Sequence, residues 1–316
     1  MTALEVVPHQ AETLSARLLD RIVDELRASR NRSRAADPRR IYVNELPSPE
    51  IVASAIKGLH AALFPRHAGG QDGSDEGLDY FVGYTLNAAL RTLAEQLQRE
   101  LAFAGERHDG NPNAEETALT IVRDFAGQLP VIRDVLISDI RAAFDGDPSA
   151  KGTEEVLLSF PGVKAVIYHR LAHSLYKLGA PILARIIAEL AHSSTGIDIH
   201  PGAEIGGSFF IDHGTGVVIG ETAVIGERVR LYQAVTLGAK RFSVDESGAL
   251  VKGEARHPIV EDDVVIYAGA TILGRVTIGR GSTIGGNVWL TRSVPPGSNI
   301  VQAQTRSEVF DSGAGI

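Results

Sequence analysis

Aliphatic residues recur at every sixth position through the last third of the chain, and small or β-branched residues follow each of them by four positions. Neither an α-helix, with a period of about 3.6, nor a plain strand, with a period of about 2, produces this spacing. A six-residue repeat with aliphatic corners is typical of a parallel β-helix built from hexapeptides. The aliphatic positions are Val260, Ile266, Ile272, Ile278, Ile284 and Leu290, and the small positions are Val264, Ala270, Val276, Ser282, Val288 and Val294.

The same ladder begins earlier in the chain and is interrupted twice. Ile219, Ile225, Leu231 and Leu237 keep the period, and Ile199, Ile205 and Ile211 keep it before a slip of two residues. Three sides of one repeat each give a coil of about 18 residues, stacked at about 4.8 Å. The pattern predicts a prism over residues 196–298. Because the ladder stops in a charged, glycine-containing stretch, we expect an extruded loop at 239–257, where scaffolds of this kind commonly carry function.

The first part of the chain has the periodicity of amphipathic helices. Apolar residues at helical spacing occupy 10–32, 51–63, 86–101 and 118–144, separated by clusters of Gly, Pro or Asp. Two further helices are expected over 153–192, broken at 179–181. We therefore predict an α+β protein with an all-helical domain at 1–195, a parallel β-helix at 196–298 and a tail at 299–316.

Composition narrows the function classes. The formal net charge of −8 gives no electrostatic reason to expect nucleic acid or a membrane surface as a partner. The chain has no run of 18 apolar residues, and its first residues lack the layout of a secretory signal, so a cytoplasmic location is expected. With no cysteine in the sequence, disulfides, thiolate metal sites and a cysteine nucleophile are excluded.

Two short segments of the prism carry residues suited to acid–base chemistry. Asp198 in IDIHP and His213 in IDHGTG are fifteen residues apart, which is close to one coil. We therefore expect Asp198 to approach His213 from the adjacent layer. A carboxylate in that place orients an imidazole, fixes its tautomer and increases its basicity, and such a pair can deprotonate a hydroxyl group.

The motifs DIHPGAEIG, DHGTGVVIGETAVIG, VTLGAK and RHP, with SDIRAAFDGDPSA at 138–150, resemble serine O-acetyltransferases of the bacterial and plant type. The resemblance covers about residues 136–298. It implies a left-handed β-helix after a helical domain, and transfer of acetyl from acetyl-CoA to L-serine for cysteine biosynthesis. It also implies a homotrimer or a dimer of trimers, with sites between subunits and no permanently bound cofactor or metal.

The resemblance also implies roles for individual residues. His213 is the general base and Asp198 its partner. The substrate amine faces Asp147 and Asp212, and the substrate carboxylate faces Arg256 and His257. CoA contacts run along a groove between subunits, where Gly238, Ala268 and Gly286 are candidates by position. The chain departs from the family pattern in AKRF and in NIVQAQTRSEVF, but its last residue, Ile316, resembles the anchor that binds O-acetylserine sulfhydrylase.

Three other interpretations remain open from the sequence. A hexapeptide acetyltransferase acting on another hydroxyl acceptor, such as a sugar, would keep the fold and the His213 base. A zinc lyase on the same prism would use His200, His213 and His257 as ligands, in the manner of γ-type carbonic anhydrases. A non-catalytic scaffold would retain only the interaction made by the tail.

Overall fold

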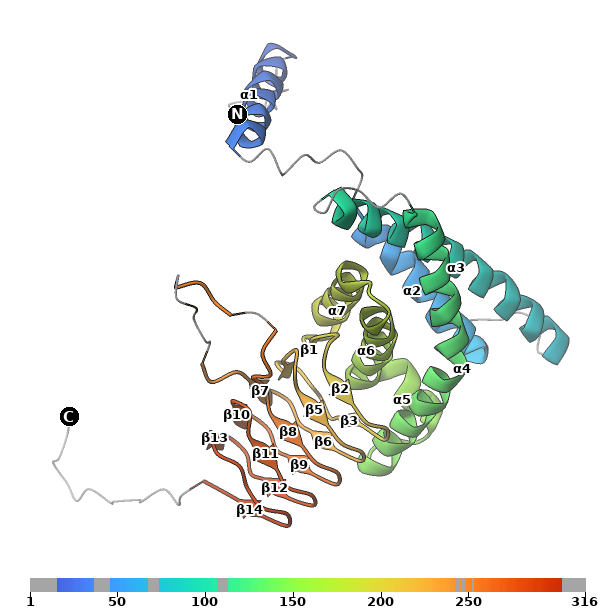
Figure 1. The fold of residues 1–316 in the computed structure, drawn as a ribbon. Helices are drawn as coiled ribbons and strands as arrows, with labels where there is room; N and C mark the ends of the chain where they lie inside the picture. Colours follow the sequence, from blue (N-terminus) through green and yellow to red (C-terminus); the bar gives the residue numbers. More distant parts are fainter. Residues whose placement is uncertain are drawn as a thin grey trace, which may run out of the picture.

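The computed structural model describes residues 16–36, 46–67, 74–106, 113–241, 245, 248–251 and 253–302. Helices come first in the chain and a stack of short strands follows, as Figure 1 shows. This arrangement confirms the predicted fold class, an all-helical part followed by a parallel β-helix of hexapeptide repeats. Within the described residues, no helix combines the length and the apolar character needed to cross a membrane.

The helical part differs from the prediction in several places: the helix expected over 86–101 spans Asp75–Glu106, and a short 3₁₀ helix forms at Pro65–His67. Residues 153–192 were expected to form two helices, but they form three, because the chain breaks at Phe160. This residue is extended (φ −80, ψ 116), as expected for a residue that precedes proline. The helices are α1 (Ala16–Ala36), α2 (Pro49–Leu63), η1 (Pro65–His67), α3 (Asp75–Glu106), α4 (Ala114–Gly146), α5 (Thr153–Ser159), α6 (Pro161–Lys177) and α7 (Pro181–Thr195).

Strands of two or three residues form three parallel sheets, which are the sides of the prism. Sheet A contains β1 (Asp198–Ile199), β4 (Val218–Ile219), β7 (Thr236–Gly238), β10 (Thr271–Leu273) and β13 (Trp289–Leu290). Sheet B contains β2 (Glu204–Ile205), β5 (Val224–Ile225), β8 (Ile259–Val260) and β11 (Thr277–Ile278). Sheet C contains β3 (Phe210–Ile211), β6 (Arg230–Leu231), β9 (Val265–Ile266), β12 (Thr283–Ile284) and β14 (Asn299–Ile300).

The aliphatic ladder lines the interior of the prism. Its positions fall on the strands and pair with one another in register from coil to coil, as Ile199 does with Ile219. Ile225 pairs with Val260 across the interruption, so the segment between β7 and β8 leaves the prism without disturbing its register. The last strand, β14, pairs with β12 just past the predicted boundary at 298.

A buried ion pair joins the helices to the first coil. Arg170 of α6 contacts Asp139 of α4 through Nε and Nη2, at 2.6 Å and 2.8 Å. The same guanidinium donates to the carbonyl oxygens of Ile205 and Gly206, at 3.0 Å and 2.8 Å. Asp139 also accepts the N–H of Phe209 at 2.9 Å. These bonds fix α4 against the start of the prism, and so they also place the residues that follow α4.

Candidate active site

His213 lies on the turn between β3 and β4. This turn is two residues longer than the other turns that lead from sheet C to sheet A, because the ladder slips between Ile211 and Ile219. His213 has a positive φ of 56°, and its side chain is 74% exposed. The slip seen in the sequence therefore projects this imidazole away from the prism.

A carboxylate and a guanidinium stand beside the His213 ring. Asp212 Oδ1 lies 3.7 Å from His213 Nε2, and Asp212 Oδ2 accepts from Arg230 Nη2 at 2.5 Å. Asp212 is only 8% exposed, whereas His213 faces solvent. Arg230 stands on β6, one coil after Phe210 of β3.

Asp147 reaches the same place from the end of α4. Its Oδ1 accepts both the N–H and the hydroxyl of Ser149, each at 2.8 Å. These bonds lower the pKa of Asp147, and the charges of Arg230 and His213 act on the same carboxylate. The structure therefore brings Asp147, Asp212 and His213 together around Arg230, and we call these four residues the acidic cluster.

Asp198 does not contact His213 in the single chain. It lies on β1, where its N–H donates to Val217 O at 2.9 Å, and its charge acts on His200. Among the described residues, no hydrogen bond or ion pair joins Asp198 to the His213 ring. The pairing of these two residues therefore stays a prediction.

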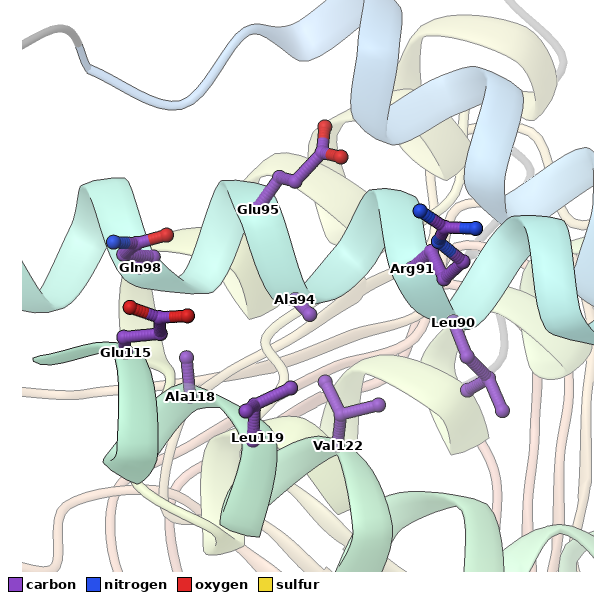
Figure 2. Close-up of a pocket in the computed structure, with 9 residues that line it drawn as sticks. All are labelled: Leu90, Arg91, Ala94, Glu95, Gln98, Glu115, Ala118, Leu119 and Val122. Atoms are coloured by element: carbon purple, nitrogen blue, oxygen red, sulfur yellow. The ribbon is translucent and has the colours of Figure 1, made fainter.

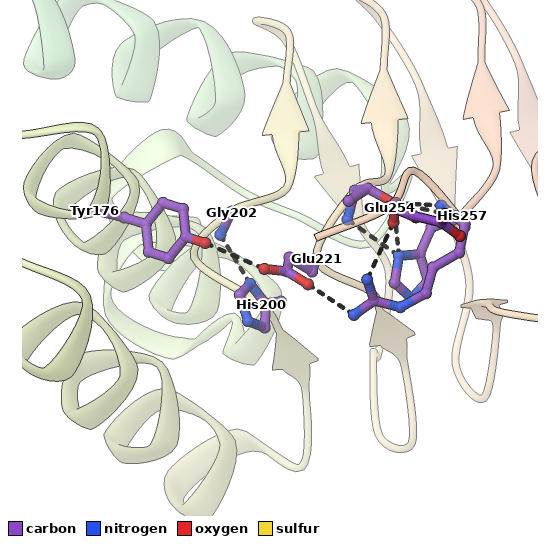
Figure 3. Close-up of polar contacts among 8 residues, drawn as sticks. Tyr176, His200, Gly202, Glu221, Glu254 and His257 are labelled. Carbon is purple, nitrogen blue, oxygen red and sulfur yellow. Dashed lines mark hydrogen bonds and ion pairs between the residues drawn. The ribbon is translucent and has the colours of Figure 1, made fainter. Parts of the chain in front are cut away.

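Arg256 belongs to a second group of residues, at the turns that lead from sheet A to sheet B. Its Nη2 donates to Glu221 Oε2 at 2.6 Å, and Glu221 Oε1 accepts from the hydroxyl of Tyr176 at 3.2 Å. Figure 3 shows Tyr176, Glu221 and His200 close together at this end of the prism. The contact with α6 thus holds the carboxylate that orients Arg256.

Thr222 holds the two residues of the RHP motif through their backbone and the imidazole. Its hydroxyl accepts the N–H of Arg256 at 2.9 Å, and its own N–H donates to His257 Nδ1 at 3.0 Å. Burial, with a smaller effect from the charge of Arg256, lowers the pKa of His257 to about 4. His257 is therefore uncharged at neutral pH, with its proton on Nε2. We call Tyr176, Glu221, Thr222, Arg256 and His257 the cationic cluster.

The two clusters lie at opposite ends of the strands of sheet A, one at the turns that lead into these strands and the other at the turns that leave them. His213 precedes β4, whereas Glu221 follows it. The extended residues Val217 to Gly220 that separate these turns span roughly 10 Å at about 3.3 Å per residue. This backbone span is longer than the distance between the amine and the carboxylate of one amino acid, which share a carbon atom.

The candidate CoA residues also lie at both ends of the strands of sheet A. Ala268 and Gly286 lie on successive turns from sheet C to sheet A, where Ala268 O accepts the N–H of Asn287 at 2.8 Å. Gly238 is the last residue of β7, at the opposite end of the strands of sheet A. Its carbonyl accepts the N–H of Gly274 at 2.9 Å. A cavity of about 280 Å³ beside it is lined by Lys240, Arg241, Val251, Glu254, Ala255, Arg256, Gly274 and Arg275.

A larger cavity, of about 360 Å³, lies between α3 and α4 in the helical part (Figure 2). Its walls combine apolar side chains with Arg91, Glu95, Gln98 and Glu115. It contains no histidine, serine or threonine that could act as a base or nucleophile. None of the candidate site residues from the sequence lines this cavity.

The histidines proposed as zinc ligands are not gathered within one chain. His200 and His257 lie at one end of sheet A, and His213 lies at the other. Within the part of the chain that the structure describes, no group of three or more His, Cys, Asp or Glu side chains is arranged to hold a metal ion. Ile316, the candidate anchor for a partner, lies outside the described residues.

Sequence reasoning missed four residues that hold the candidate site together: Tyr176, Glu221, Thr222 and Arg230. Glu221 and Thr222 belong to the GET segment, which resembles the family, but the resemblance implied no role for either residue. Arg230 lies outside the motifs that carry the resemblance. Its position in register with Phe210, one coil before it, was the only available indication that it faces the same surface.

Comparisons with known proteins agree with the fold described above. The family model for the bacterial transferase hexapeptide (six repeats) matches residues 257–292. A plasmid serine acetyltransferase of Synechococcus elongatus is 60% identical over 276 residues, which cover 86% of this chain and 86% of the relative. Serine acetyltransferase 1 of Entamoeba histolytica, solved with L-cysteine, has a TM-score of 0.70 at 37% identity, over 79% of this chain and 86% of that one.

A further solved structure is the serine acetyltransferase of Neisseria gonorrhoeae in complex with serine. It has a TM-score of 0.52 at 28% identity, over 80% of this chain and 96% of that one. The fold and these similarities define the class of the protein, an acyltransferase built on a β-helix of hexapeptide repeats. With 60% identity to a relative over most of both chains, the chain belongs to the serine acetyltransferase family.

Proposed function

We propose that this protein transfers the acetyl group of acetyl-CoA to the hydroxyl of L-serine, giving O-acetyl-L-serine for cysteine biosynthesis. The observation that carries the proposal is the acidic cluster, which places two carboxylates beside an exposed imidazole. A zwitterionic acceptor needs carboxylates for its amine and a cation for its carboxylate, and the chain offers both. The serine and cysteine complexes of the relatives support the same acceptor class.

In this proposal His213 acts as the general base. Its imidazole removes the proton of the serine hydroxyl as the oxygen attacks the thioester carbon of acetyl-CoA. The resulting imidazolium then returns the proton to the CoA sulfur as the tetrahedral intermediate collapses. Asp198 orients the imidazole and fixes its tautomer. Because the chain has no cysteine and two bound substrates can react side by side, transfer is direct, without an acyl-enzyme.

The acceptor is held at both charged ends. Asp147 and Asp212 receive the ammonium group next to the base. Arg256 presents a planar fork of donors to the carboxylate. His257, uncharged because burial lowers its pKa to about 4, adds a neutral N–H donor from Nε2.

The separation of the two clusters supports a site shared by two copies of the chain. One copy supplies Asp147, Asp212 and His213, and the cationic cluster of its neighbour supplies Arg256 and His257. A heterologous contact repeated around a three-fold axis gives each of three copies one complete site, so we propose a homotrimer or a dimer of trimers. CoA then lies between copies, against Ala268 and Gly286 of one and Gly238 of the next.

A partner is also part of the proposal. The C-terminal Ile316 binds O-acetylserine sulfhydrylase, the enzyme expected to consume the product. Removal of the last residues is the corresponding test, and it should abolish co-elution of the two enzymes while leaving acetyl transfer unchanged.

The experiment that tests the proposed activity is CoA release from acetyl-CoA by the purified full-length protein. L-serine is compared with homoserine, with a galactoside and with no acceptor. We expect release that depends on L-serine. Release only with a sugar would keep the fold and the base but remove the roles of Asp147, Asp212 and Arg256. No release with any acceptor would overturn the proposed function.

A further inference from the structure

Among the described residues, Arg230 is the one arginine or lysine whose side chain pairs with a carboxylate of the acidic cluster. Its Nη2 donates to Asp212 Oδ2 at 2.5 Å, while the other carboxylate oxygen lies 3.7 Å from His213 Nε2. The charge of Arg230 also acts on Asp147. One guanidinium thus faces both carboxylates that are proposed to receive the substrate amine.

Aromatic rings hold this guanidinium in place. Its central carbon lies 4.9 Å from the ring centroid of Phe210 and 4.6 Å from that of Tyr232. Tyr232 in turn stacks on Tyr267, with ring centroids 5.0 Å apart and an angle of 13° between the planes. Cation–π contacts of this kind favour arginine over lysine, because the planar group can stack on the ring.

The end of α4 closes over the same group. A Cβ atom added to Gly146 would lie 2.9 Å from the Phe210 ring and 3.6 Å from Arg230 Nη1, so the glycine lets the helix end approach both. Asp147 follows directly in the chain. The side chain of Arg230 is 25% exposed, and its Nε is buried without a hydrogen-bond partner. The hydrogen bond that the guanidinium makes to Asp212 comes from Nη2.

We propose that Arg230 is a positioning residue for the acceptor amine: it fixes the Asp212 carboxylate and offsets one of the two negative charges of the subsite. This inference rests on the proposed function. Asp147 and Asp212 together with Arg230 leave one net negative charge, which matches the single ammonium group of serine. The ion pair also fixes which oxygen of Asp212 lies beside the base: Oδ2 is held by Arg230, and Oδ1 lies 3.7 Å from His213 Nε2.

The role predicts a specific kinetic signature for Arg230→Met. Without its partner, Asp212 is free to rotate, and two neighbouring carboxylates repel each other. The kcat/KM for L-serine is expected to fall roughly ten- to hundredfold, the usual effect of losing a hydrogen bond between charged groups. The loss is expected mainly in KM for serine, with KM for acetyl-CoA unchanged.

A double-mutant cycle separates this role from a structural one. Arg230→Met, Asp212→Asn and the double variant are compared by kcat/KM for L-serine. If Arg230 acts through Asp212, the double variant is no worse than Asp212→Asn alone. The matched control is Arg228→Met, since Arg228 pairs with Asp263 at 2.6 Å on a different turn of the same prism, and serine kinetics are expected to stay at the wild-type level.

Each outcome is decisive. Losses that multiply in the double variant, or an unchanged KM for serine in Arg230→Met, would overturn the positioning role while leaving the acetyltransferase activity in place. A lack of effect of both Asp147→Asn and Asp212→Asn would instead refute the amine subsite of the proposed function. If Arg230→Met fails to fold, the same cycle is run with Arg230→Lys, which keeps the charge but loses the stacked fork and is expected to show a smaller, still non-additive loss.

Discussion

At the scale of single residues, exposure distinguishes His213, the proposed base, from the residues beside it. The side chain of His213 is 74% exposed, whereas Asp212 beside it is nearly buried and already paired with Arg230. An exposed side chain contributes little to the free energy of folding, because it buries almost no surface. Changes at His213 are therefore expected to affect activity without affecting stability.

Replacing His213 by Ala is predicted to lower kcat for serine acetylation by roughly a hundred- to ten-thousandfold, as is usual when a general base is lost. The thermal midpoint should stay at the wild-type value. His192→Ala is a suitable control, because His192 is a half-exposed residue of α7 paired only with Glu189. A His213→Ala variant with near-normal turnover would refute the assignment of the base.

The motifs of the sequence predicted candidate site residues, but they did not indicate the residues that contact and orient these candidates in the structure. Asp212, His213 and Arg256 lie in segments with a clear resemblance. Arg230 and Tyr176 do not, because their importance depends on which residues the coils and α6 bring beside them. Among the described residues of the single chain, no hydrogen bond or ion pair joins Asp198 to His213, so this pairing stays a prediction.

At the scale of elements, the packing of helices on the first coil decides where Asp147 and Tyr176 stand. Helix α6 approaches β3 so closely that a Cβ atom on Gly162 would lie 2.1 Å from the carbonyl oxygen of Ile211. The Asp139–Arg170 pair holds α4 and α6 on the same coil. Periodicity predicted the helices and the ladder, but only the break before Pro161 gives α6 its own direction.

Gly162→Ala is predicted to lower the free energy of unfolding by about 1–3 kcal/mol, the usual effect of overpacking a close contact. Gly83→Ala is the matched control. Gly83 is also a helical glycine, but a Cβ atom there would meet nothing within 4 Å. For Gly83→Ala we expect the free energy of unfolding to increase by about 0.5–1 kcal/mol, because alanine has a higher helix propensity than glycine. Urea denaturation measures both changes, and equal effects of the two substitutions would contradict the close packing of α6 on β3.

At the scale of the whole molecule, buried histidines in the helical part and on the prism link stability to pH. Burial lowers the pKa of His169 well below its ordinary value, and it lowers the pKa of His257 to about 4. The unfolded chain therefore binds more protons than the folded chain below about pH 6.5, and stability falls as the pH is lowered through this range. Glu100 and Asp139, whose pKa values burial raises, act in the opposite direction.

His169→Gln removes one of these titrating groups, so its stability should depend less on pH than that of the wild type between pH 7 and pH 5.5. The comparison uses urea midpoints at both pH values, which makes the result independent of the cost of the substitution itself. A His169→Gln variant with the full dependence would show that His169 is not kept neutral by burial.

The central claim is that two copies of the chain assemble one active site, with the base from one copy and the serine carboxylate site from the next. Co-expression of His213→Ala with Arg256→Ala, each impaired on its own, tests it most directly. If the claim is correct, oligomers assembled at random from equal amounts of the two variants should recover about a quarter of the wild-type serine-dependent CoA release, because that fraction of all interfaces combines an intact His213 with an intact Arg256. Activity no higher than the sum of the two separate variants, in oligomers shown to be mixed, would contradict a shared site.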